Sequence, residues 1–324
     1  MKKNVLVLIP MEDRHVDMLK NAAPEYDFRF VNGGEETQED ADWANISLGN
    51  INAKYLHGNA NLKWVQTSSA GVEPYIEKGV LAEGTKLTNA TGAYGLAISE
   101  HMLGMLLEIQ KKLSLYRDQQ KEHKWDSLGK VTSVYGSTVL VLGMGDIGGE
   151  FAKRCKALGA YVIGMRRKDT SKPEYADEIC LTEDLDKVLP RADVVAITLP
   201  GTKETANMID KKRIESMKDE AIILNVGRGS IIDTEAMCDA LISGKLMGAG
   251  LDVTMPEPLP EGHRLWDIPT AVITPHISGF YHLKETHERI VRIFAENLKH
   301  FYNGENLKNP VDFAAGYANG EKPV

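Results

Sequence analysis

One stretch in the middle of the chain limits its fold more than any other. The apolar run Thr138-Val-Leu-Val-Leu142 leads directly into Gly143-Met-Gly-Asp-Ile-Gly148, and Glu150–Leu158 then has the composition of a helix. A second apolar run, Tyr161–Met165, follows at the distance that a strand–helix–strand unit requires. Two strands joined in this way run parallel in one sheet, so the stretch predicts an α/β fold.

The residues of the turn have separate tasks in such a unit. Gly143 permits the tight turn, Gly145 lets the backbone approach a pyrophosphate, and Gly148 allows the helix to pack closely. Asp146 and Ile147 lie between them, where the N-terminus of the helix points at the phosphates. We expect this stretch to bind a dinucleotide; a strand, turn and helix that bind nothing are the alternative.

Short apolar strands alternate with helical stretches along the whole chain, which is typical of a parallel sheet covered by helices. The expected strands are Val5–Ile9, Phe28–Val31, Trp64–Thr67, Thr138–Leu142, Tyr161–Met165, Val194–Thr198, Ile222–Val226, Met247–Asp252 and Val272–Thr274. The expected helices are Asp13–Ala22, Gly95–Leu115, Glu150–Leu158 and Ile290–Phe301.

The dinucleotide stretch lies in the middle of 324 residues, a length that suits two domains. We predict that residues 98–283 form the dinucleotide-binding domain. It would be inserted in a substrate-binding domain made of residues 1–97 plus 284–324. The apolar-periodic helix Ile290–Phe301 suits the return of the chain to that domain.

Composition narrows the choice of partner and compartment. The net charge of -8 argues against a nucleic-acid surface. No segment approaches the roughly 20 apolar residues of a membrane span, and the run Val5–Ile9 is too short for a signal peptide and reads as a strand. Cys155, Cys180 and Cys238 fit neither a metal-ligand spacing nor a closed disulfide set. We expect reduced thiols in a cytoplasmic protein without a bound metal.

Three reactive residues follow the dinucleotide stretch: Arg228 in a glycine-flanked turn, Glu257 between two prolines, and His276 after an apolar run. An arginine can grip a carboxylate with two hydrogen bonds. An imidazole can give a proton to an oxygen near neutral pH, and a carboxylate beside it favours its protonated form. The combination predicts hydride transfer to a 2-keto acid.

The choice between NAD and NADP depends on the end of the second strand of the unit. The sequence there is Met165-Arg-Arg-Lys168, and no acidic residue comes before Asp169. A carboxylate at this place would hold the ribose hydroxyls, whereas Arg166 and Arg167 can clamp a 2′-phosphate. We therefore expect NADP(H) to be preferred over NAD(H). A solvated basic turn that tolerates either coenzyme is the alternative.

Several motifs together resemble the D-isomer-specific 2-hydroxyacid dehydrogenase family over nearly the whole chain. They are Gly143–Gly148, Leu199-Pro200 with Thr205, Asn225–Asp233, Gly250-Leu-Asp-Val253, Pro256-Glu-Pro258, Leu265-Trp266, Pro275-His276 and Asn309-Pro-Val311. The resemblance implies a Rossmann-type coenzyme domain inserted into a flavodoxin-like parallel-sheet substrate domain, with the active site in the cleft. It also implies a homodimer. Trp125 follows the long helix and fits either a subunit contact or a cap of that helix.

The resemblance also implies roles for single residues. Arg228 would bind the keto oxygen and the carboxylate, His276 would donate the proton, and Glu257 would be its partner. The loop Ser68-Ser-Ala-Gly-Val72 would hold the carboxylate with backbone N–H groups. The implied substrate-binding residues are Ala70, Gly71, Val72, Arg228, Trp266 and His276, although Trp266 fits core or lid packing equally well. The implied coenzyme-binding residues are Gly143, Gly145, Asp146, Ile147, Gly148, Arg166, Arg167, Leu199, Pro200, Thr205, Val226, Gly227, Asp252 and His276, with Asp252 on the nicotinamide carboxamide.

The expected function is the reduction of a small 2-keto acid, similar to glyoxylate or hydroxypyruvate, to the D-2-hydroxy acid with NADPH. Arg166 stands at a position where the family more often has Asp. The predicted partner of His276 is Glu257, whereas the formate dehydrogenase branch resembles a pairing of glutamine with histidine. The sequence shows no counterpart of the regulatory domain of many phosphoglycerate dehydrogenases, which weakens a role in serine biosynthesis. The alternatives are a reductase of bulkier 2-keto acids and a nucleotide-sensing protein similar to the corepressors of this family.

Overall fold

The structure, a computed structural model, describes residues 3–168, 170–314 and 316–318. The chain forms two compact units: the first joins Met1–Tyr94 to Phe280–Val324, and the second is Gly95–Gly279. The second unit is thus an insertion in the sequence of the first. The assignment of one unit to the substrate and the other to the coenzyme, with domain limits near residues 97 and 284, stays a prediction.

The sheet of the first unit has five parallel strands in the order β2-β1-β3-β4-β5, the order of flavodoxin-like folds. Leu6, Ile46 and Val65 on these strands are fully buried, because helices cover both faces of such a sheet. The strands are β1 (Asn4–Val7), β2 (Asp27–Phe30), β3 (Ile46–Leu48), β4 (Trp64–Gln66) and β5 (Lys86–Thr88). The helices of this unit are α1 (Asp13–Ala22), α2 (Gln38–Trp43), α3 (Glu73–Ile76) and α10 (Lys284–Asn303), with one 3₁₀ helix, η1 (Ala53–Tyr55). A short hairpin is formed by β13 (Val311–Asp312) and β14 (Tyr317–Ala318).

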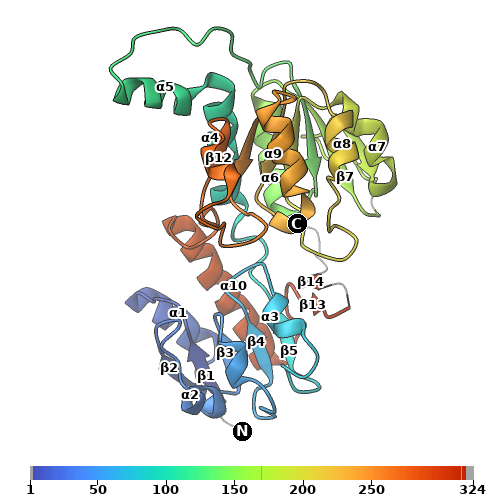
Figure 1. The fold of residues 1–324 in the computed structure, drawn as a ribbon. Coiled ribbons are helices and arrows are strands. Elements are labelled where there is room, and N and C mark those ends of the chain that lie inside the picture. Colours follow the sequence, from blue (N-terminus) through green and yellow to red (C-terminus); the bar gives the residue numbers. More distant parts are fainter. Residues whose placement is uncertain (1–2, 169, 315, 319–324) are drawn as a thin grey trace. The chain divides into compact units, whose positions relative to one another are not determined.

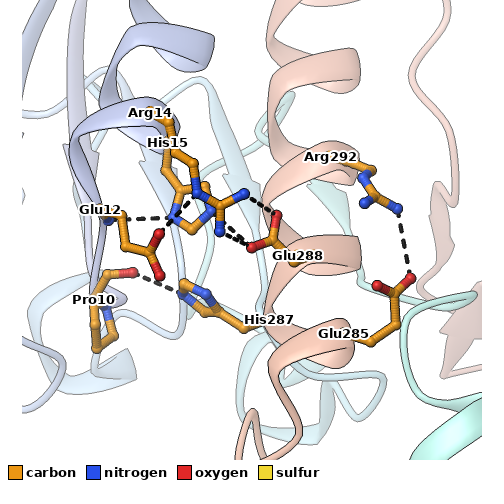
Figure 2. A network of polar contacts seen from close by, with 8 residues as sticks. All are labelled: Pro10, Glu12, Arg14, His15, Glu285, His287, Glu288 and Arg292. Atoms are coloured by element: carbon orange, nitrogen blue, oxygen red, sulfur yellow. Dashed lines mark hydrogen bonds and ion pairs between the residues drawn. The ribbon is translucent and has the colours of Figure 1, made fainter.

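The chain returns to the first unit in helix α10, which packs beside α1 (Figure 1). A polar network joins the N-terminal parts of the two helices, and Figure 2 shows Glu288 of α10 facing both Arg14 and His15 of α1. The fully buried His15 accepts a bond on Nδ1 from the Glu12 backbone at 3.2 Å, so its Nε2 carries the hydrogen that faces Glu288 at 3.3 Å. Nε2 of His287, on the same helix, lies 2.7 Å from the Pro10 carbonyl oxygen.

The sheet of the second unit has seven parallel strands in the order β12-β11-β10-β9-β6-β7-β8, a Rossmann-type order with an added edge strand. The strands are β6 (Thr138–Leu142), β7 (Tyr161–Arg166), β8 (Glu178–Leu181), β9 (Val194–Ile197), β10 (Ala221–Asn225), β11 (Leu246–Leu251) and β12 (Ala271–Ile273). The helices are α4 (Gly95–Lys111), α5 (Leu113–Lys121), α6 (Asp146–Ala157), α7 (Leu185–Val188), α8 (Lys211–Ser216) and α9 (Thr234–Ile242), with short turns η2 (Thr182–Asp184), η3 (Leu189–Arg191), η4 (Gly229–Ile231) and η5 (Arg264–Asp267).

Two parallel sheets confirm the predicted fold class, and each predicted strand is present within one or two residues of its expected bounds. Three strands of these two sheets were not predicted: β3, β5 and β8. They have three or four residues each and include polar members, so their apolar periodicity is too brief to distinguish them from loops.

The long helix predicted for Gly95–Leu115 is confirmed as far as Lys111, but its continuation through Lys112 to Leu115 is wrong. Helix α4 ends at Lys111, and Lys112 has a left-handed φ of 58° before α5 begins. Figure 1 shows α5 and the loop after it leading away from the body of the second unit. Helix α6 begins at Asp146, earlier than the predicted Glu150, because the glycines of its first turn give no helical signal.

Other expectations about the chain concern its thiols and its helices. Cys155, Cys180 and Cys238 are unpaired and buried in the second unit, as the sequence predicts for core thiols. Within the described ranges, none of the helices combines the length and the apolarity that a membrane-spanning segment needs.

Candidate active site

The reactive residues of the second unit follow three neighbouring strands, at the end where each strand stops. Arg228 comes after β10, Asp252 directly after β11, and His276 after β12. The three strands are adjacent and parallel. Their carboxyl ends therefore meet at one edge of the sheet, which is where ligands of such sheets bind.

His276 and Glu257 form a direct contact, with Nδ1 of the imidazole 2.6 Å from Oε1 of the carboxylate. Their side chains are 46% and 41% exposed, so the pair is open to solvent. The backbone of His276 has a left-handed φ of 52°, and its N–H donates to the Asp252 carbonyl at 2.8 Å. The structure thus brings together the acid and the imidazole that the sequence predicts as partners.

Asp252 is 1% exposed and organises the turn that carries His276. Its Oδ1 accepts hydrogen bonds from the Thr274 hydroxyl at 2.5 Å and from the Ile277 backbone at 3.0 Å. Its Oδ2 accepts from both the backbone N–H and the hydroxyl of Ser278. Four bonds use the roughly four acceptor positions of a carboxylate. The predicted contact of Asp252 with a nicotinamide carboxamide stays a prediction.

His101 of α4 belongs to the same cluster, and no motif in the sequence singles it out. Its Nε2 lies 3.0 Å from the Thr274 hydroxyl and 3.9 Å from Oδ1 of Asp252. The single hydroxyl hydrogen of Thr274 is donated to Asp252, so Nε2 of His101 must carry the hydrogen of the second bond. A histidine beside Glu100 in a mostly apolar helix has no sequence signal that points to such a partner.

Arg228 is held in an extended backbone, half-buried, by the turn after β10. The Asn225 side chain donates to the Arg228 carbonyl at 2.9 Å, and one guanidinium nitrogen donates to the Gly227 carbonyl at 2.8 Å. The flanking glycines are required, because a Cβ at Gly227 would lie 2.4 Å from the Leu199 carbonyl oxygen and one at Gly229 would lie 2.0 Å from backbone atoms of Thr254.

The glycines of the dinucleotide turn behave as their sequence positions predict. Gly143 has a φ of 99°, which favours glycine. A Cβ on Gly145 would meet no atom within 4 Å, so its backbone is open to an approaching group, whereas a Cβ on Gly148 would lie 1.9 Å from the Gly143 carbonyl oxygen. Asp146 accepts a hydrogen bond at 2.9 Å from the N–H of Gly95 at the start of α4. Ile147 is half-buried beside it in α6.

The loop after β9 lies beside the turn after β10. The Thr205 hydroxyl donates to the Pro200 carbonyl at 2.7 Å and closes the loop. Leu199 approaches Gly227 so closely that no side chain fits there. Val226 is 7% exposed and donates to the end of β9 at 3.1 Å. These residues therefore lie at the same edge as the dinucleotide turn.

Arg166 ends strand β7, and its guanidinium donates to the backbone carbonyl and the hydroxyl of Ser171, both at 3.1 Å. Arg167 follows and is exposed. Asp169, the first acidic residue after this strand, lies outside the described residues. Trp266 is 50% exposed, and its indole N–H donates to the Pro260 carbonyl at 3.0 Å, so core packing does not account for it.

In the first unit, the loop of residues 68–72 follows β4 at the carboxyl edge of its own parallel sheet. Ala70 is exposed, Gly71 is half-buried and Val72 is 1% exposed. The predicted carboxylate loop therefore has an accessible centre and an anchored end.

Comparison with known proteins identifies the family. A family model described as D-isomer specific 2-hydroxyacid dehydrogenase, NAD binding domain, matches residues 103–278, which lie within the second unit. The solved structure of a D-isomer specific 2-hydroxyacid dehydrogenase family protein from Aeromonas salmonicida is 32% identical, with a TM-score of 0.85 and coverage of 97% of this chain and 100% of that one. The chain belongs to the D-isomer specific 2-hydroxyacid dehydrogenase family.

Two curated relatives show the range of substrates in this neighbourhood. A D-3-phosphoglycerate dehydrogenase of Archaeoglobus fulgidus is 29% identical over 314 residues, which cover 95% of this chain but only 59% of that protein. A glyoxylate/hydroxypyruvate reductase B of Pectobacterium carotovorum is 29% identical over 273 residues, which cover 82% of this chain and 84% of that one. As a member of the family, the chain is an oxidoreductase that acts on the CH–OH group of donors with NAD(P).

Proposed function

We propose that this 2-hydroxyacid dehydrogenase reduces a small 2-keto acid to the D-2-hydroxy acid with NADPH. The observation that carries the proposal is the contact of His276 with Glu257, at the same sheet edge as Arg228. It supplies a proton donor, a charge partner for that donor and a fixed cation. These are the groups that reduction of a 2-keto acid requires.

The residues of the dinucleotide turn fit the coenzyme. The open backbone at Gly145 and the N-terminus of α6 suit a pyrophosphate, because unpaired N–H groups and the helix dipole favour negative charge there. When bound, the nicotinamide supplies the hydride that reaches the keto carbon.

His276 delivers the proton that completes the reduction. The Glu257 carboxylate accepts a hydrogen bond from the N–H at Nδ1 of His276, which leaves Nε2 to face the substrate. In the imidazolium form Nε2 also carries a hydrogen, which passes to the keto oxygen as the hydride arrives. The products are a hydroxyl group and a neutral imidazole that keeps its hydrogen on Nδ1.

We assign the recognition of charge to two groups. The guanidinium of Arg228 stabilises the negative charge that develops on the keto oxygen and binds the neighbouring carboxylate. The N–H groups of loop 68–72 bind that carboxylate as well.

Arg166 supports the choice of NADPH. It stands at the end of β7, next in the sheet to the strand that leads into the dinucleotide turn. A 2′-phosphate there would accept bonds from the guanidinium and from the Ser171 hydroxyl that lies 3.1 Å from it. An acidic residue at this place would instead repel the phosphate.

The substrate is proposed as glyoxylate or hydroxypyruvate, which the relative from Pectobacterium carotovorum is named for. The test measures NADPH and NADH oxidation with glyoxylate, hydroxypyruvate, branched and aromatic 2-keto acids, and the reverse reaction with D-3-phosphoglycerate. The highest kcat/KM should belong to a small 2-keto acid with NADPH. Turnover of D-3-phosphoglycerate alone, or of a bulky keto acid alone, would overturn the proposed substrate class. No turnover with any of these compounds would favour a nucleotide-sensing protein.

We further propose a homodimer and a cytoplasmic location. The arm formed by α5 and its loop carries Trp125, which is fully exposed, and Tyr135, which is 79% exposed. A second copy of the chain that packs against this arm would remove the surfaces of these aromatic side chains from water. Sedimentation should give twice the mass of the chain and a monomer for Trp125→Ser. The buried, unpaired cysteines support a reducing compartment.

A further inference from the structure

Every carbonyl of loop 68–72 accepts a hydrogen bond from the first unit. The Tyr94 hydroxyl donates to Ser68, the Ala90 backbone to Ser69 at 3.0 Å, and the Asn89 amide to Ala70 at 2.8 Å. The Ser69 hydroxyl donates to the Gly71 carbonyl at 2.7 Å, and the Tyr75 backbone donates to Val72 at 2.9 Å.

The N–H groups of the same loop differ from its carbonyls in their hydrogen bonding. Ser68 donates to the Asn50 side chain at 3.0 Å. In the part of the chain that the structure describes, the N–H groups of residues 69–72 donate to no protein acceptor. Four successive donors are therefore available to an anion.

The pinned carbonyls fix where these donors point. In a trans peptide the carbonyl of one residue and the N–H of the next lie in one plane and point in opposite directions. The bond from Asn89 to the Ala70 carbonyl therefore sets the direction of the Gly71 N–H. In the same way, Tyr94 sets the direction of the Ser69 N–H. An unpinned peptide could turn its carbonyl oxygen toward a carboxylate and repel it.

Asn89 is itself held by the end of the chain. It is 1% exposed, and Asn309 donates to the carbonyls of Asn89 at 3.2 Å and of Thr91 at 2.7 Å. The Asn89 N–H donates back to the Asn309 carbonyl at 3.3 Å. Asn309 has a left-handed φ of 53°, a conformation that asparagine tolerates. This gives the Asn309-Pro-Val311 motif a physical task.

We propose that Asn89, fixed by Asn309, and Tyr94 are positioning residues for the substrate carboxylate. They act through the peptide planes of loop 68–72 and do not touch the substrate. The inference rests on the proposed function of that loop, and it adds residues that lie two contacts from the substrate.

The test uses Asn89→Ala, Tyr94→Phe and Asn309→Gly in the full-length enzyme. Phenylalanine keeps the ring and removes only the hydroxyl, and glycine keeps the left-handed backbone. Each variant should raise the KM for the best 2-keto acid of the panel roughly three- to tenfold. The inhibition constant of oxamate, an unreactive carboxylate analogue, should rise in parallel. The kcat and the dissociation constant of NADPH should change less than about twofold.

The matched control is Asn59→Ala. Asn59 also donates its amide to a carbonyl, that of Ala41 at 2.9 Å, but before β4, at the amino edge of the same sheet. It should leave the KM unchanged. An active wild type whose Tyr94→Phe and Asn309→Gly variants keep their KM would overturn the positioning role alone. A parallel loss of kcat, NADPH affinity and thermal stability would show a structural role and overturn it too. A wild type that is inactive on every 2-keto acid would overturn the proposed function together with it.

Discussion

Nδ1 of His276 lies 2.6 Å from Oε1 of Glu257, across 19 positions of sequence. Glu257 lies in the loop that leaves β11, and His276 follows β12, the strand next to it. The adjacency of the two strands therefore creates the pair. Since both side chains are nearly half exposed, solvent screens their attraction, and the value of the contact lies in the orientation of the imidazole.

Glu257→Gln should lower the rate of reduction. Glutamine keeps the size of the side chain, but its amide can donate as well as accept, so Nδ1 of His276 loses a partner that only accepts. A charged acceptor also forms a stronger hydrogen bond than a neutral one. The orientation that leaves Nε2 for the substrate should therefore be held less firmly, and the reductive kcat/KM at saturating NADPH should fall roughly tenfold.

Oxidation of the D-2-hydroxy acid provides the internal control for that experiment, because it uses the same imidazole in the reverse direction. Its kcat/KM should fall together with that of reduction, while NADPH binding should stay unchanged. Equal reductive kcat/KM values of wild type and variant would remove the glutamate from the proposed mechanism.

His276→Ala should lower turnover about 10²–10⁴-fold, as for a lost general acid, and it should leave NADPH binding intact.

Arg228→Lys should damage both KM and kcat. Lysine keeps the charge but loses the planar fork that binds a carboxylate and a developing oxyanion together. The loss in kcat/KM should be on the order of 10²-fold, as for removal of one oxyanion donor. Arg264→Lys is the matched control, because Arg264 pairs with Glu235 and Asp239 on the surface of the same unit. Near-wild-type kinetics of the Arg228 variant would exclude it from the site.

The sequence predicts the elements whose signal is local. The glycines of the turn at Gly143 specify a backbone, and Arg228 and His276 follow apolar runs that had to be strands of one parallel sheet. The roles of His101 and Asn309 could not be predicted. Each depends on a partner far along the chain, 173 positions for His101 with Thr274 and 220 for Asn309 with Asn89. Neutral polar side chains carry no periodic signal, so only the packed fold selects their partners.

Arg166→Asp should reverse the coenzyme preference. A charge-assisted hydrogen bond contributes about 1.5–3 kcal/mol when well formed, so the KM for NADPH should rise by roughly tenfold or more while that for NADH falls. The control is Arg191→Asp, since Arg191 pairs with Glu178 at 2.6 Å on the surface of the same sheet. A wild type that already prefers NADH would contradict the proposed task of Arg166.

Thr274→Val should weaken catalysis without touching the reacting groups. Valine keeps the shape but removes the hydroxyl that joins His101 to Asp252. The buried carboxylate would lose a donor, and the turn that fixes His276 would loosen. We expect kcat to fall roughly tenfold, as for an unsatisfied buried group, with a smaller change in NADPH affinity. Thr274→Ser, which restores the hydroxyl, should recover most of the activity; equal kinetics of the two variants would disprove the link.

Glu288→Gln should reduce stability near neutral pH and flatten its dependence on acid. A hydrogen bond from Arg14, supported by His15 and opposed by burial, holds the pKa of Glu288 below its usual 4.5. The ionised carboxylate therefore stabilises the folded state above that usual value, and this contribution disappears as the pH falls through the lowered pKa. The urea midpoint of the variant should lie below that of the wild type at pH near 7, and the two should converge as the pH falls through the lowered pKa. Glu285→Gln, on the same turn of α10 but 40% exposed and paired with Arg292 at 3.5 Å, should change the midpoint much less. A constant difference between wild type and Glu288→Gln at all pH values would show that packing, and not the charge, holds α10 to α1.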